Sequence, residues 1–250
     1  MMSICFFLFL LFSKVIFANT TDLLLRVDQN LRISEGMMKS QVTMTVIRGK
    51  REKEYSFFLQ RTDSKSAIVF LSPARDKGVK LLKDGSSIWM YFPSIEQSQR
   101  ISGHMVRQGF MGSAVSYEDM MNFSAFLDNY KIVSETQSQF EGIDCVLFEL
   151  QGTRRDMSYP NRNICVEPIQ AVILWDRMFS MDQTLMKEMR FYEIQLITSQ
   201  NKPESIKYVP QKVEIINHLE DSLFTKILYK DTEWKSVIDE QHFSLRWLEQ

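Results

Sequence analysis

Histidine and cysteine are scarce in this chain of 250 residues, and the scarcity limits the chemistry that it can perform. The sequence contains three of each. His104, His218 and His242 lie far apart, and none belongs to a pair at the spacing of metal ligands. The sequence also lacks a His-Glu-x-x-His pair, a Cys-x-x-Cys pair and a phosphate-binding Gly-x-x-x-x-Gly-Lys-Ser/Thr loop. We therefore expect no metal site and no cofactor.

Signals for catalysis are also weak. Residues 109–113, Gly-Phe-Met-Gly-Ser, lack the Gly-x-Ser-x-Gly elbow, and no helical pattern begins directly after Ser113. Glu118 and Asp119 are adjacent carboxylates, but neighbouring residues on a helix point apart. Acidic residues are also favoured in a first helical turn by the helix dipole alone. We expect no catalytic residues, and an enzyme is the least favoured class of function.

An excess of either charge is absent too. The chain has 30 basic and 31 acidic residues, so its formal net charge is −1. Electrostatic binding of nucleic acid requires a basic face or stripe, and attachment to anionic lipids requires a cluster of basic residues. The balance of charge predicts neither kind of partner.

The first eighteen residues are typical of a targeting segment. Residues 4–12 are apolar, Ala18 is small, and a polar stretch begins at Asn19. The apolar run is shorter than the roughly 20 residues that cross a membrane. This pattern predicts a cleavable signal peptide over residues 1–18 and export to the periplasm. No basic residue precedes the run, and bulky Ile16 precedes the cleavage position, so an uncleaved anchor is the alternative.

Cys145 and Cys165 are the two cysteines that would remain after cleavage. An oxidising compartment permits a disulfide between them. Their separation in sequence does not show that their Cα atoms come close enough to be bridged. Two buried, unpaired thiols are the other interpretation, and the sequence leaves both open.

Hydrophobic periodicity predicts one helix followed by many strands. Leu24, Val27 and Leu31 recur at helical spacing, and Gly36 could end that helix. Alternation with a period of two then predicts a hairpin over residues 42–59. Further strands are expected near 67–71, 79–82, 88–92, 97–102, 131–140, 145–151, 162–175, 184–199, 209–218 and 223–230, with short helices within 117–126 and 243–248.

The predicted elements indicate a mainly β (α+β) fold in one domain over residues 19–250. No linker, internal repeat or shift of composition divides the chain. One strongly curved antiparallel sheet, or a partly open barrel, accommodates these strands. An open barrel can hold a ligand on its concave side, because its own side chains need not fill that space. The 15 methionines and 18 phenylalanines could line such a cavity, since methionine adapts to irregular apolar ligands. Filling an ordinary core is the other interpretation.

Four stretches carry a resemblance to a known family. They are residues 59–61 (Leu-Gln-Arg), 70–78 (Phe-Leu-Ser-Pro-Ala-Arg-Asp-Lys-Gly), 84–94 (Asp-Gly-Ser-Ser-Ile-Trp-Met-Tyr-Phe-Pro-Ser) and 110–119 (Phe-Met-Gly-Ser-Ala-Val-Ser-Tyr-Glu-Asp). Together they resemble the outer-membrane lipoprotein-sorting protein family, which is related to the periplasmic lipoprotein carrier LolA and its receptor LolB. This chain has Ala114 where the family usually has aspartate, and residues 153–183 follow the family pattern poorly.

The resemblance implies a half-open, strongly curved antiparallel β-barrel of about ten or eleven strands, with helices forming a lid over the concave face. It also implies an apolar cavity for acyl chains. Arg61 matches a family arginine at a strand end that helps to hold the lid shut through hydrogen bonds, for which its five donors suit it. The candidate cavity residues are Met44, Val46, Phe57, Leu59, Phe70, Trp89, Tyr91, Phe110 and Met111.

The expected function is a periplasmic carrier that binds the acyl chains of lipoproteins or lipids and moves them toward the outer membrane. Each buried CH₂ group contributes about 0.8 kcal/mol, so acyl chains need shielding to cross water. An inner-membrane transporter and an outer-membrane acceptor would be its partners. The alternative is a non-enzymatic docking or assembly module of the envelope, accessory to a transporter and without cargo. The sequence does not distinguish lipoprotein from lipid cargo, nor does it give the oligomeric state.

Overall fold

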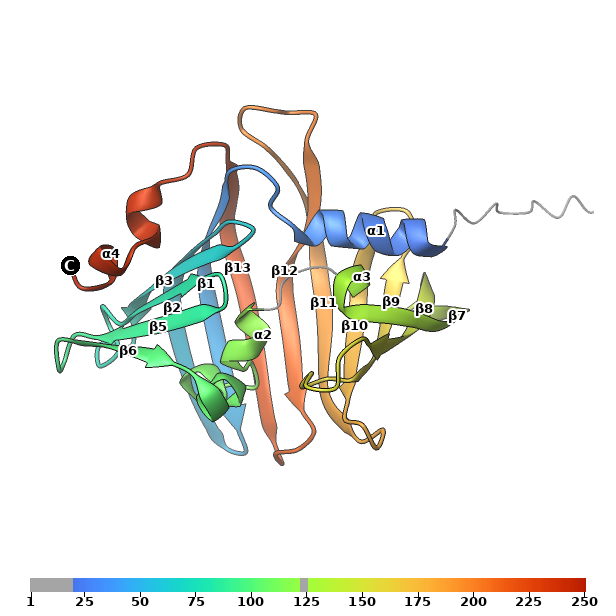
Figure 1. The fold of residues 1–250 in the computed structure, drawn as a ribbon, viewed down its shortest axis with the longest axis horizontal. Helices are drawn as coiled ribbons and strands as arrows, with labels where there is room; N and C mark the ends of the chain where they lie inside the picture. The colour runs from blue at the N-terminus through green and yellow to red at the C-terminus, as the bar shows by residue number, and fades with distance from the viewer. Residues whose placement is uncertain (1–19, 122–125) are drawn as a thin grey trace, which may run out of the picture.

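The computed structural model describes residues 20–121 and 126–250, and one antiparallel sheet dominates it (Figure 1). The predicted signal peptide, residues 1–18, lies outside the described residues. The strands are β1 (Met37–Arg48), β2 (Arg51–Arg61), β3 (Lys65–Ser72), β4 (Lys80–Asp84), β5 (Ser87–Phe92), β6 (Gln97–Ile101), β7 (Tyr130–Phe140), β8 (Ile143–Gly152), β9 (Asn161–Glu167), β10 (Val172–Phe179), β11 (Leu185–Thr198), β12 (Ile206–Asn217) and β13 (Leu223–Lys235).

Apart from α1, the helices are short. They are α1 (Thr20–Leu31), η1 (Gly103–Arg107), η2 (Phe110–Gly112), α2 (Tyr117–Met121), α3 (Phe126–Asn129), η3 (Glu240–Phe243) and α4 (Leu245–Leu248), where η denotes a 3₁₀ helix. Within residues 20–121 and 126–250, no helix has the length and apolar character needed to cross a membrane.

The sheet is curved and does not close. Its strand order is β6-β5-β4-β3-β2-β1-β13-β12-β11-β10-β9-β8-β7, so the first and last strands pair in the middle. β6 and β7 are the two edges, and the chain between them carries η1, η2, α2 and α3 across the concave face (Figure 1). The curved antiparallel architecture agrees with the expectation, but the sheet has 13 strands instead of ten or eleven.

One strand expected from the sequence is two strands in the structure. The apolar segment 162–175 is interrupted between Glu167 and Val172, which end β9 and begin β10. The carboxylate of Glu167 accepts hydrogen bonds from the backbone N–H groups of Ile169 and Gln170 at 2.8 and 2.7 Å. Ala171 completes the turn with a φ of 54°. A turn without glycine, closed by a side chain, gives little signal in a hydrophobic pattern.

The expected first hairpin is confirmed. Val42 pairs with Phe57 and Met44 with Tyr55, so alternate residues of β1 and β2 face the concave side. Gly49 lies in the turn with a φ of 58°, a conformation that favours glycine.

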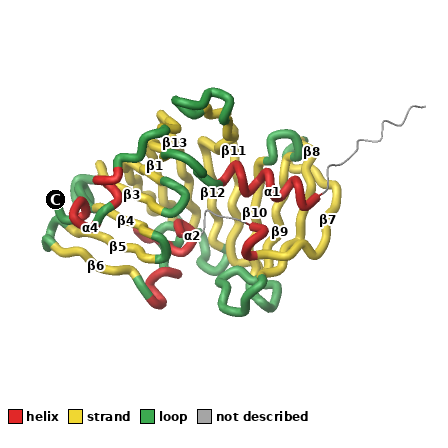
Figure 2. Tube along the Cα trace, turned by 45° about the horizontal axis from the view of Figure 1, so that its top comes forward, coloured by secondary structure: helices red, strands yellow, loops and turns green. Residues whose placement is uncertain are grey.

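Different segments cover the two faces of the sheet. On the concave side, α1 packs Leu23, Leu24 and Val27 against buried residues of β8, β9 and β10. On the opposite side, Phe243 and Leu248 of the C-terminal segment pack against β3 and β4. Figure 2 shows α1 lying across the strands and α4 at the far end of the sheet. The concave face between these elements contains the candidate site.

The two cysteines form a disulfide. Cys145 on β8 and Cys165 on β9 are bonded, with Cα atoms 5.6 Å apart. Both are buried with Leu174 and Trp175, on the face of the sheet opposite α1. The bond therefore links neighbouring strands near the β7 edge, where a single further strand supports them.

We expect that replacing both cysteines with alanine lowers the free energy of unfolding by about 2–4 kcal/mol, because the cross-link restricts the unfolded chain. Urea unfolding monitored by circular dichroism measures this difference. Reducing agent should destabilise the wild type by a similar amount and leave the double variant unchanged. Equal stability of the oxidised wild type and the double variant would contradict the prediction.

Candidate ligand cavity

A cavity of about 320 Å³ lies between the concave face of the sheet and the helices that cross it. This volume is near the lower end of the range for small-molecule sites, about 300–1,000 Å³. Strands on both sides of the β1–β13 pair form its apolar wall. The apolar side chains that β1–β5 and β11–β13 contribute are Val42, Met44, Phe57, Leu59, Ile68, Leu81, Ile88, Met189, Phe191, Val213, Ile215, Ile227 and Tyr229.

Four of the nine candidate residues line this cavity: Met44, Phe57, Leu59 and Phe110. Val46 and Phe70 lie in the packed core beside it instead. The ring of Phe70 lies 5.3 Å from that of Phe57 and 5.7 Å from that of Phe110. Phe70 thus supports two cavity residues from behind.

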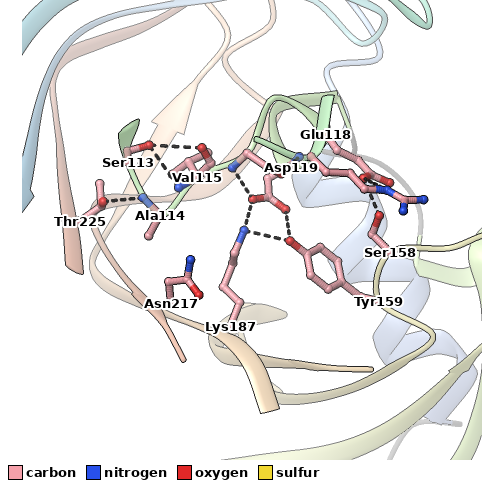
Figure 3. A network of polar contacts seen from close by, with 12 residues as sticks. Ser113, Ala114, Val115, Glu118, Asp119, Ser158, Tyr159, Lys187, Asn217 and Thr225 are labelled. Atoms are coloured by element: carbon pink, nitrogen blue, oxygen red, sulfur yellow. Dashed lines mark hydrogen bonds and ion pairs between the residues drawn. The ribbon is translucent and has the colours of Figure 1, made fainter. Parts of the chain in front are cut away.

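Met111 packs against the same core, although it is not part of the cavity wall. It adopts a φ of 52°, and its carbonyl accepts a hydrogen bond from the Tyr55 hydroxyl at 3.3 Å. Ala114, the residue that departs from the family pattern, lies in the same segment and is buried. The N–H of Ala114 donates a hydrogen bond to Thr225 Oγ1 at 2.9 Å (Figure 3). This segment is therefore held against β1, β2 and β13 by backbone contacts.

Trp89 and Tyr91 do not line this cavity. Successive side chains of a strand point to opposite faces, and on β5 it is Ile88 that lines the cavity. Trp89 and Tyr91 pack on the other face with the C-terminal segment. The ammonium of Lys80 lies 5.8 Å from the Tyr91 ring and 5.1 Å from the Trp247 ring. The two aromatic side chains thus fix the C-terminus rather than a ligand.

The opposite wall of the cavity is polar, and the sequence did not predict it. It is formed by α2, by the end of α3, by the loop over residues 153–160 and by β9 and β10. Its polar residues are Glu118, Asp119, Asn129, Arg154, Asp156, Ser158, Tyr159, Arg162 and Asp176. Sequence reasoning had considered Glu118 and Asp119 only as a catalytic pair or as residues of a first helical turn.

Asp119 joins α2 to the sheet (Figure 3). Its carboxylate and the hydroxyl of Ser116 each accept the other's backbone N–H, at 2.7 and 3.0 Å, which is a capping box for α2. The same carboxylate forms an ion pair with Lys187 of β11 and accepts a hydrogen bond from the Tyr159 hydroxyl at 2.9 Å. Lys187 also donates to Tyr159 at 2.8 Å. The side chains of Lys187 and Asp119 are only 7% and 6% exposed, so this contact is shielded from water.

A second buried ion pair joins Arg162 of β9 to Asp176 of β10. The guanidinium lies 4.6 Å from the Phe126 ring and 5.3 Å from the Tyr130 ring. Burial disfavours the charged guanidinium, but the neighbouring Asp176 carboxylate outweighs it and raises the pKa of Arg162. The polar wall therefore contains charges of both signs, and these charges form ion pairs with one another or with the adjacent sheet.

Polar contacts fix α1 along its length. The Asp28 carboxylate accepts the backbone N–H groups of Phe126 and Leu127 at 2.6 and 3.1 Å, which caps α3. Arg26 and Asn30 donate to backbone carbonyls of the β9–β10 turn at 2.5–3.1 Å. Burial raises the pKa of Asp28, against the effect of its two hydrogen bonds.

The C-terminus of α1 receives its cations from the sheet. The last carbonyls of a helix lack intrahelical donors and attract positive charge, yet α1 has no basic residue in its last turn. Arg61, at the end of β2, donates to Leu31 O at 3.3 Å, and Lys207 of β12 donates to Gln29 O at 2.6 Å. Arg61 thus lies where the resemblance expects it, at the end of a strand and bonded to a covering helix.

A family model described as an uncharacterised protein matches residues 62–250. The chain belongs to that family. No curated protein matches the sequence.

Several solved structures share the fold over nearly their whole length. An outer membrane lipoprotein-sorting protein domain from Vibrio parahaemolyticus has a TM-score of 0.78 and 18% identity, and the match covers 93% of this chain and 100% of that one. A DUF1329 family protein from Desulfovibrio piger has a TM-score of 0.80 and 22% identity over 91% and 96% of the two chains. A LolA superfamily protein from Nitrosomonas europaea has a TM-score of 0.71 and 17% identity over 92% and 100%. At these identities the likeness establishes the fold, and the resemblance seen in the sequence is confirmed as a LolA-like fold.

Among residues 20–121 and 126–250, no three or more His, Cys, Asp or Glu side chains are grouped so that they could hold a metal ion. The expectation of no metal site therefore stays a prediction for the whole chain.

We expect Lys207 to make stability depend on pH above neutrality. Burial, assisted by repulsion from Arg61 and opposed by Asp63, lowers the pKa of Lys207 from 10.5 to about 8. Between these values the unfolded chain holds a proton that the folded chain has released, so stability rises with pH across this window. The full effect is on the order of 3 kcal/mol, since one pKa unit corresponds to about 1.4 kcal/mol.

Urea unfolding at several pH values between 8 and 10 measures this contribution. Lys207→Met should flatten the rise in stability, whereas Lys230→Met, at an exposed position of β13, should preserve it. If the free energy of unfolding has the same slope against pH in the wild type and in Lys207→Met, the pH dependence does not come from Lys207.

Proposed function

We propose that this chain is a carrier that binds the acyl chains of a lipoprotein or a lipid in the concave cavity and moves them through the periplasm toward the outer membrane. The observation that carries this proposal is the cavity itself. Thirteen apolar side chains of β1–β5 and β11–β13 line a volume that the protein does not fill. The LolA-like fold of a lipoprotein-sorting domain and of a LolA superfamily protein supports it.

The composition of the wall suits an irregular apolar ligand. Five methionines line the cavity: Met44, Met120, Met157, Met178 and Met189. Methionine is unbranched and polarisable, so it repacks around different chain shapes at low cost. Burial of each CH₂ group contributes about 0.8 kcal/mol, which makes even a short acyl segment a substantial source of affinity.

Release of cargo requires part of the cover to move. α1 is bound to β2, to β12, to the β9–β10 turn and to α3. α2 is only five residues long and is attached to β11 through the Asp119–Lys187 contact. We assign the moving part of the cover to α2 and the loop over residues 153–160, and the fixed part to α1.

A periplasmic location is part of the proposal. The apolar segment over residues 4–12 followed by a polar stretch is typical of a secretory signal. The Cys145–Cys165 disulfide is consistent with an oxidising compartment. The role is a non-enzymatic one, in which the polar wall closes the cavity and performs no chemistry.

We expect Leu59→Lys to weaken the uptake of an acyl probe at least about tenfold, because it places an unpaired charge against the apolar ligand. Leu59 lines the cavity and is only partly buried, so the change leaves the core intact. Fluorescence titration with a neutral long-chain probe measures the effect.

Phe58→Lys is the matched control. Phe58 is the preceding residue of β2, is 40% exposed and is absent from the cavity wall. Its variant should bind the probe like the wild type. Normal uptake by a folded Leu59→Lys protein would remove this cavity as the acyl site, and absence of uptake by the wild type would favour the docking module instead.

A further inference from the structure

One cation lies in the apolar wall of the cavity. Lys83 is on β4, lines the cavity and is only 7% exposed. It follows Leu81 by two residues, so the two side chains share the concave face. Its ammonium donates to Ser64 O at 2.9 Å and forms no other hydrogen bond or ion pair within the described part of the chain. An ammonium has three donors, so two are not used by this contact.

A second polar group lies beside it. Ser66 of β3 is directly opposite Lys83 in the strand register and also lines the cavity. Its side chain is buried, with 6% of the residue exposed, and its hydroxyl forms no hydrogen bond within residues 20–121 and 126–250. Two adjacent donors thus face the same space.

The surrounding charge is positive. Arg61 pairs with Ser66 in the register of β2 and β3, so Arg61, Ser66 and Lys83 form a row across three strands. Lys207 lies near Arg61 and is 5% exposed. The acidic groups that act on these cations are Asp63 and Asp84, and both are exposed to solvent. A positive potential therefore remains on the buried side, where the effective dielectric constant is low.

Lys83 differs from Arg61 and Lys207 in the backbone carbonyl to which it donates. Arg61 and Lys207 donate to carbonyls at the end of α1, so holding the helix accounts for both. Lys83 donates instead to a carbonyl in the β2–β3 connection, and its side chain lines the cavity. Leu59, Ile68, Leu81 and Ile88 line the same cavity. This arrangement is that of a polar anchor at one end of an apolar site.

We propose that Lys83 and Ser66 bind the anionic head group, a carboxylate or a phosphate, of a single-chain amphiphile whose acyl tail lies along the apolar wall. This inference rests on the proposed carrier function and narrows its cargo. A cavity of about 320 Å³ suits one acyl chain better than the several chains of a lipoprotein anchor. Hydrogen bonds between charged partners would supply the preference for an anion.

The test uses three ligands with the same tail: laurate, dodecyl phosphate and dodecanol. Isothermal titration of the full mature chain should show that wild type binds at least one of the anions about tenfold or more tighter than the alcohol. Lys83→Met should remove this preference and leave dodecanol binding unchanged. Ser66→Ala should weaken the binding of the anion by a smaller factor, about threefold.

Lys80→Met is the matched control. Lys80 is on the same strand and likewise donates to one backbone carbonyl, that of Trp247 at 2.9 Å, but its side chain packs on the opposite face of the sheet. This variant should keep the preference for the anion. Circular dichroism and thermal unfolding verify that each variant is folded.

The outcomes separate the two proposals. If wild type binds all three ligands equally, or if Lys83→Met weakens laurate and dodecanol alike, the anion site is wrong while the carrier function stands. If none of the three binds to the wild type, the carrier function itself fails. Preference for laurate over dodecyl phosphate, or the reverse, identifies a carboxylate or a phosphate as the head group.

Discussion

The antiparallel pairing of β1 with β13 is the interaction on which the rest of the structure depends. It runs from Met37 opposite Lys235 to Arg48 opposite Leu223, and it joins the N-terminal meander of β1–β6 to the C-terminal meander of β7–β13. Because the first and last strands take the centre of the sheet, the edges fall at β6 and β7, in the middle of the chain. The connection between those edges must then cross the concave face, and it brings α2 and α3 over it (Figure 1). An open interior with a helical cover follows from this one pairing.

The cover divides the interior into two unlike parts. α1 fills the part over β8, β9 and β10 with leucine and valine side chains, so that region is an ordinary core. The part over β1–β5 and β11–β13 keeps an unfilled volume with an apolar wall on one side and paired charges on the other. Buried ion pairs contribute little to stability in general, because desolvation offsets their attraction. In this fold they fix where short helices and a loop rest against the sheet, which apolar contacts alone would specify weakly.

Much of the sheet could be predicted from alternation of apolar residues, as the β1–β2 hairpin illustrates. The first limit was which face of a strand points inward. β5 carries large apolar residues on both faces, so its pattern did not show that Ile88, rather than Trp89, faces the cavity. The turn at Glu167–Ala171 was the second, because a carboxylate closes it in place of a glycine. The third was the polar wall, since Asp119 and Lys187 are 68 positions apart and no local pattern couples them. Their partner Tyr159 also lies in the stretch where the family resemblance is poorest.

The proposed carrier role requires that the space under α2 holds an amphiphile during transit. Native mass spectrometry of the mature protein purified from a periplasm, followed by lipid extraction, tests it most directly. The account predicts a bound mass of lipid size that appears in the organic extract and is absent after delipidation. A protein that is empty when isolated, and that stays empty after incubation with lipids and lipopeptides, would contradict it.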